Sequence, residues 1–122
     1  MAIIKLTKDN FGKYGEFLDL LDESELKKKS IFQEGFFADV VALEFNQGNQ
    51  PTISVCHVKK QSDNIISFLE AHQYACEGLL PLDGDVIIFV GIMDRDFRTE
   101  SIEAFYVPKG TFVKLNPLIV HG

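Results

Sequence analysis

The chain has 122 residues, of which 46% are hydrophobic and 25% charged, values typical of one soluble globular domain. Its formal net charge of −6 argues against a nucleic-acid surface, because binding to phosphates needs clustered cations. The longest apolar run, Val86 to Met93, is too short to cross a bilayer, and the N-terminus lacks an export signal. We therefore expect a cytoplasmic protein that has neither a membrane nor a nucleic acid as partner.

The first 30 residues predict two short helices. Thr7 can cap a helix over residues 8–13, and a second, charged helix is predicted over residues 23–29. The residues between them, 16–21, are expected to be extended.

From residue 36 on, the sequence is typical of short strands separated by turn residues. Strands are expected at 36–45, 52–59, 64–74, 78–82, 85–93, 102–107 and 112–115. Strands spaced about ten residues apart, with little helix, indicate a β-sandwich or a small barrel. The sequence thus predicts one domain over 1–122, with a helical segment at about 7–30 and a barrel at about 36–122.

The stretch LEAHQYACEGLLPLDGD, residues 69–85, carries most of the candidate chemistry. If residues 66–74 form a strand, then Glu70, His72 and Tyr74 point to one side, because side chains alternate along a strand. A half-buried strand with a solvated face would explain the same residues. No P-loop, dinucleotide fingerprint, CxxC, GxSxG or HExxH motif is present.

Two further histidines and the cysteines are open to structural readings. His57 lies among apolar residues, as core histidines often do, and His121 lies one residue from the last residue, where chain ends can fray. Cys56 and Cys76 lack metal-ligand spacing and are expected to be free thiols.

Several motifs together resemble the cupin superfamily. Glu77 followed by Gly84 is similar to the end of a first cupin motif, and Pro108-Lys109-Gly110 with His121 is similar to a second. Within the cupins, the chain resembles the ureidoglycolate lyase (ureidoglycolate hydrolase) family, and the matching residues are Phe11, Tyr14, Gly15, Asp39 to Phe45, Leu69, Glu70, His72, Pro81 and Gly84. It departs from that family at His57, where relatives have Arg, and at Glu77, where they have Gln.

The resemblance implies a mainly β, cupin-type jelly-roll β-barrel with one or two short N-terminal helices. It also implies a lyase-like enzyme acting on a small carboxylated metabolite, with His72, Glu77 and His121 as catalytic residues. The substrate-binding candidates are His57, Lys59, Glu70 and Tyr74. Histidine suits acid or base work because its pKa lies near neutrality, whereas a Glu beside an anionic substrate places like charges together.

Two alternatives remain open for the same residues. His72, Glu77 and His121 are a donor set that suits divalent Fe, Mn, Zn or Ni, although the usual cupin His-x-His is here His72-Gln73-Tyr74. The other alternative is a non-catalytic cupin that binds a small ligand. In each case we expect a homodimer, because a short open barrel leaves strand edges to cover.

Overall fold

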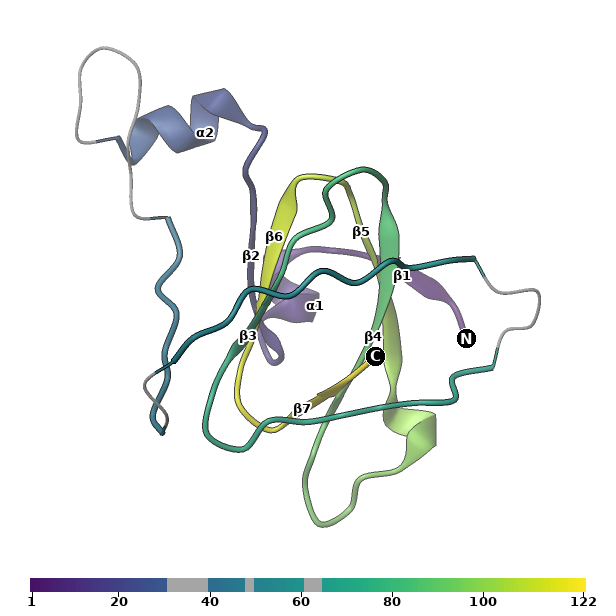
Figure 1. Cartoon of the computed structure of the whole chain (residues 1–122). Coiled ribbons are helices and arrows are strands. Elements are labelled where there is room, and N and C mark those ends of the chain that lie inside the picture. Colours follow the sequence, from purple (N-terminus) through teal and green to yellow (C-terminus); the bar gives the residue numbers. More distant parts are fainter. Residues whose placement is uncertain (31–39, 48–49, 61–64) are drawn as a thin grey trace.

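A computed structural model describes residues 1–30, 40–47, 50–60 and 65–122, which form a mainly β protein with two short helices and two sheets (Figure 1). None of the helices in these ranges has the length and the apolar content that crossing a membrane requires.

The larger sheet has four strands in the spatial order β1-β5-β4-β7. These strands are β1 (Ile3–Lys5), β5 (Glu103–Val107), β4 (Val86–Ile92) and β7 (Ile119–His121). β1 runs parallel to β5, whereas β4 is antiparallel to both of its neighbours.

The smaller sheet has three strands in the order β2-β6-β3. β2 (Gly15–Asp19) and β3 (Glu77–Leu79) both run antiparallel to the central strand β6 (Thr111–Leu115). Figure 1 shows this sheet facing the larger one, with strands from distant parts of the chain side by side.

Both helices begin at the capping residues that their sequences provide. Thr7 caps α1 (Lys8–Phe11) in a capping box with Asn10, and Asp22 caps α2 (Glu23–Lys28) by accepting a hydrogen bond from the backbone N–H of Glu25. A single 3₁₀ turn, η1 (Thr99–Ser101), precedes β5.

The core lies between the two sheets and is closed on one side by α1. Its central members are fully or almost fully buried: Phe11, Tyr14, Val90, Phe105, Val107, Val113 and Leu115. The ring of Phe11 meets the ring of Phe105 edge to face, at a centroid distance of 5.2 Å. Phenylalanine packed against valine and leucine therefore forms part of the core.

The structure confirms the helices at both predicted places and the strands predicted near 16–21, 85–93, 102–107 and 112–115. The strand predicted at 78–82 is shorter and begins at Glu77. Two strands, β1 and β7, were missed by the sequence pattern. Residues 119–121 form a buried strand rather than a frayed end.

Three predicted strands are not formed in the described residues. Residues 52–59 are exposed and pair with no strand of the described chain, and 65–74 form one bridge, between Glu70 and His121, but no strand. Of 36–45, residues 36–39 lie outside the described ranges, and Phe45 alone bridges to Ala75. Alternation of apolar residues is not sufficient for a strand, since the backbone also needs a partner. Within the described ranges the two sheets do not close into a barrel.

Candidate metal centre

Four side chains with metal-ligating atoms come together at one edge of the structure. They belong to Glu70, His72, Glu77 and His121, and one ligand atom from each lies within 4.8 Å of the others. They come from sequence positions up to 51 residues apart, since the cluster spans positions 70 to 121.

Strand register explains why these side chains meet. His121 on β7 lies opposite Val90 of β4, so the two side chains share the face that turns toward the core. Glu77 on β3 lies opposite Leu115 of β6, which is also a core residue. One ligand therefore comes from each sheet, and both point into the space between the sheets at their edge strands.

The segment that carries Glu70 and His72 is held against the free side of β7. The backbone N–H of Glu70 donates to the carbonyl of His121 at 2.9 Å, and the N–H of His121 donates back at 2.8 Å. The N–H of Leu118 donates to the carbonyl of His72 at 2.7 Å. Because Glu70 lies opposite His121 in an antiparallel bridge, and His72 follows two residues later, their side chains fall on the same face as His121.

Glu77 is the centre of the cluster. Its Oε2 lies 2.6 Å from Nε2 of His72 and 3.0 Å from Nε2 of His121. Glu70 is a more distant member, with Oε1 3.8 Å from Nε2 of His121. The two imidazole rings have a centroid separation of 5.3 Å and are tilted by 49°.

The protonation state of His121 follows from its two hydrogen-bond partners. Its Nδ1 lies 2.9 Å from the carbonyl oxygen of Ile119, which can only accept, so Nδ1 carries hydrogen. An ionised Glu77 also only accepts, so Nε2 then carries hydrogen as well and the ring is an imidazolium. Without a metal, His121 and Glu77 thus form an ion pair in a largely buried position.

The pKa shifts agree with this ion pair. The hydrogen bond from His121 lowers the pKa of Glu77, against the opposing effect of burial. Burial lowers the pKa of His121, but hydrogen bonds to Glu77 and Ile119 and the negative charges of Glu77 and Glu70 outweigh it, so the net shift is upward. Hydrogen bonding and charge thus favour the ionised carboxylate of Glu77 and the protonated imidazole of His121 in this pair.

The distances between the ligating atoms fit a transition metal with four ligands in tetrahedral geometry, or with more than four. Ligands about 2.0–2.1 Å from a tetrahedral metal lie roughly 3.4 Å apart, between the shortest and longest separations of this cluster. The hydrogen bond from Nδ1 of His121 to a backbone carbonyl is the second-shell contact that fixes a metal-binding histidine with Nε2 toward the ion. Loss of the proton on Nε2 would free its lone pair for the metal.

The remaining substrate-binding predictions fall outside this cluster. His57 and Lys59 lie on the exposed segment 50–60, and Tyr74 is 47% exposed. Glu70, predicted to bind substrate, is instead a fourth member of the ligand group. Its alternation with His72 along the chain was the sequence signal that placed it on the same face.

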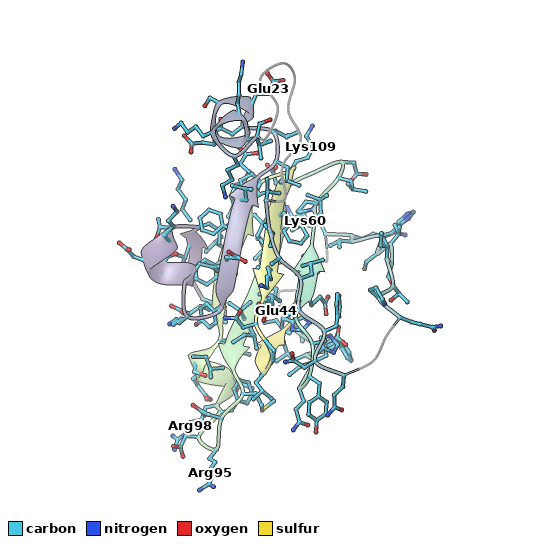
Figure 2. All side chains as sticks on the ribbon, turned by 90° about the vertical axis from the view of Figure 1, so that its left-hand side faces the viewer. Glu23, Glu44, Lys60, Arg95, Arg98 and Lys109 are labelled. Carbon is cyan, nitrogen blue, oxygen red and sulfur yellow. The ribbon has the colours of Figure 1, made fainter. Side chains whose placement is uncertain are left out.

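Both arginines of the chain lie on a solvent-exposed loop. Arg95 and Arg98 follow β4, and Figure 2 shows them at the end of the molecule opposite Glu23 of α2. Neither supplies the cluster with the two-pronged carboxylate contact that a guanidinium makes.

No protein-family model matches the sequence, and no curated protein is significantly similar to it.

Proposed function

We propose that Glu70, His72, Glu77 and His121 bind one divalent transition metal, Fe, Mn, Zn or Ni, and that the protein is a metal-dependent, cupin-type enzyme acting on a small carboxylated metabolite. The observation that carries this proposal is the approach of four ligating atoms within 4.8 Å at the edge between the two sheets.

The donor set supports a transition metal over Mg²⁺ or Ca²⁺. Two imidazole nitrogens and two carboxylates suit Zn, Fe, Mn or Ni, whereas the hard alkaline-earth ions prefer oxygen ligands alone. His121 is only 5% exposed, its backbone N–H and C=O are both hydrogen-bonded to Glu70, and its Nδ1 is bonded to the carbonyl of Ile119, so little entropy is lost when it binds an ion.

Charge balance supports a carboxylated substrate. Two carboxylates beside an anionic substrate repel it, but a divalent ion cancels their charge. When bound, the metal would hold a carboxylate or a neighbouring hydroxyl or carbonyl oxygen and polarise it. A bound metal could therefore hold the substrate carboxylate without an arginine, and none of the ion pairs among the described residues joins an arginine to the cluster.

His72 is the more exposed of the two histidines in the cluster. Its side chain is 42% exposed, against 6% for His121, so it can exchange protons with a bound substrate or with water. We assign both histidines to metal binding through Nε2, and in the metal-free protein His72 is the more accessible of the two for proton transfer. The cupin-type jelly roll belongs to the same proposal: its supports are the two facing sheets and the inward direction of the ligands.

A second candidate is a metal-free lyase of the ureidoglycolate lyase type. The hydrogen bond of 2.6 Å between His72 and Glu77 favours it, because a carboxylate that orients an imidazole is a common acid–base pair. In this reading Glu77 orients the imidazole of His72, and His72 moves the proton of the substrate.

Turnover with and without a chelator separates the two candidates. Purified protein is supplied with ureidoglycolate and with a panel of small hydroxy- and keto-acids, either loaded with Zn, Mn, Fe or Ni or treated with EDTA. Turnover that requires metal supports the proposed enzyme. Glyoxylate release that survives EDTA supports the metal-free lyase, and metal binding without any turnover contradicts both enzymatic readings.

Metal titration of matched variants locates the site. Glu77→Gln and His121→Ala should each weaken binding by at least about 100-fold, because each removes a direct ligand rather than an outer contact. Glu16→Gln changes a carboxylate outside the cluster, on strand β2 at the other edge of the smaller sheet from β3, and should leave the affinity unchanged. Equal affinity in all variants would place the metal elsewhere.

A further inference from the structure

We propose that a second copy of this chain covers the side of the molecule formed by residues 40–47, 50–60 and 65–76, with segment 50–60 of the two copies paired as antiparallel strands. Figure 1 shows 50–60 and 65–76 crossing the side of the sheets that faces the viewer, with 40–47 at its left edge, and in Figure 2 the same side lies to the right. The face includes Glu70 and His72 of the metal cluster, but segment 50–60, which would pair across it, lies outside that cluster.

The first observation is an unusual exposure of apolar side chains on these segments. Ile53 is 100% exposed, and seven other large side chains are at least 44% exposed: Leu43, Phe45, Val55, Val58, Ile65, Phe68 and Tyr74. The largest apolar patch of a typical monomer is about 300–600 Å². Together these eight side chains leave roughly 900 Å² open, whereas a standard interface buries about 800 Å² on each partner.

The second observation is the backbone of segment 50–60. Every residue in it is exposed, no backbone hydrogen bond joins it to another described residue, and Figure 1 shows it running across the front of the sheets. Its sequence alternates like a strand, with Ile53 and Val55 on one side and Val58 on the other. An extended stretch of β-forming residues with free N–H and C=O groups is a template for strand addition.

The charges of the segment favour a second copy as the occupant. Segment 50–60 contains Lys59 and Lys60 and no carboxylate, in a chain whose net charge is −6. Two such acidic chains therefore repel each other least where these segments meet. Antiparallel pairing centred on Cys56 places Lys59 opposite Ile53, so that the lysines of the two copies lie at opposite ends of the ribbon and do not face each other.

Two-fold symmetry makes this contact self-limiting. A strand that pairs with its own copy in antiparallel fashion forms an isologous interface, which closes as a dimer and leaves neither copy of that segment exposed. The apolar side chains of 43–45 and 65–68 would then be covered from both copies in one contact.

The test is the oligomeric state of the full chain, measured by light scattering after size exclusion over a concentration series. We expect a dimer of two 13.8 kDa chains, and we expect the substitution pair Ile53→Asp and Val55→Asp to weaken it by at least about 100-fold. Leu82→Asp is the matched control, because Leu82 is 72% exposed but lies outside the proposed face, and it should leave the dimer intact.

Amide hydrogen exchange gives a second readout. Amides of 52–59 should become more protected as the wild-type concentration rises, and should exchange rapidly at every concentration in the doubly substituted chain. A wild-type chain that stays monomeric at about 100 μM, or a dimer that the two substitutions leave unchanged, would overturn the proposal. Metal affinity should be the same in all three proteins, so failure here is distinct from failure of the metal site.

Discussion

Replacing Glu77 by Gln should remove most of the stabilisation that a bound metal gives the fold. The substitution keeps the size of the side chain and leaves an amide that can still hydrogen-bond to His72 and His121. It removes the charge and the better ligand. The substitution thus separates metal binding from simple packing at the centre of the cluster.

The expected size follows from mass action. A metal at 100 times its dissociation constant stabilises the native state by about 2.7 kcal/mol. For a chain of this length that corresponds to a rise in Tm of roughly 8–13 °C. If Glu77→Gln weakens binding about 100-fold, the same metal concentration adds only about 0.4 kcal/mol, or roughly 1–2 °C.

Differential scanning calorimetry with metal and with EDTA measures both shifts. Glu16→Gln serves as the control and should keep the full metal-dependent rise. A Glu77→Gln protein whose Tm rises with metal as much as that of the wild type would refute the assignment of Glu77 as a ligand. A wild type whose Tm does not respond to any of Zn, Mn, Fe or Ni would refute the site as a whole.

Three further outcomes are expected. In EDTA, the ion pair of Glu77 and His121 should stabilise the fold fully between about pH 4.5 and 6.5. This stabilisation is lost at lower pH as Glu77 protonates at its lowered pKa, and at higher pH as His121 deprotonates at its raised pKa. The urea midpoint of unfolding should therefore fall on both sides of this window. Tyr14→Phe removes the hydrogen bond that the buried hydroxyl donates to Glu103 and should lower the free energy of unfolding by about 1–2 kcal/mol, seen as a lower urea midpoint at constant m. His57→Ala should change metal affinity less than about twofold in a calorimetric titration, because His57 lies on an exposed segment outside the cluster.

The sequence predicts the elements that carry their own local signals. Thr7 and Asp22 cap the two helices, and the β-branched run of 86–92 lies between partners on both sides. The strand expected at 52–59 also contains β-branched residues but has no partner strand in the described chain. A local sequence pattern does not specify which segments pair. β7 was missed because three residues near a chain end give too short a pattern.

The candidate site, too, could be predicted from the sequence only in part. Alternation alone predicts that Glu70 and His72 share a face, and the structure places them so. That Glu77 and His121 meet them depends on the register of β3 on β6 and of β7 on β4, because a shift of one residue would turn either side chain away from the core. The separation of His57 from the cluster depends on the path of 50–60, which no spacing in the sequence specifies.

The measurement that tests the metal site most directly is anomalous diffraction from crystals grown with Zn, Mn, Fe or Ni, with data collected at the absorption edge of the added metal. The account predicts one strong peak about 2.0–2.2 Å from Nε2 of His72, Nε2 of His121 and a carboxylate oxygen of Glu77. Crystals that show no peak between these residues, with the hydrogen bonds from both histidines to Glu77 still in place, would contradict it.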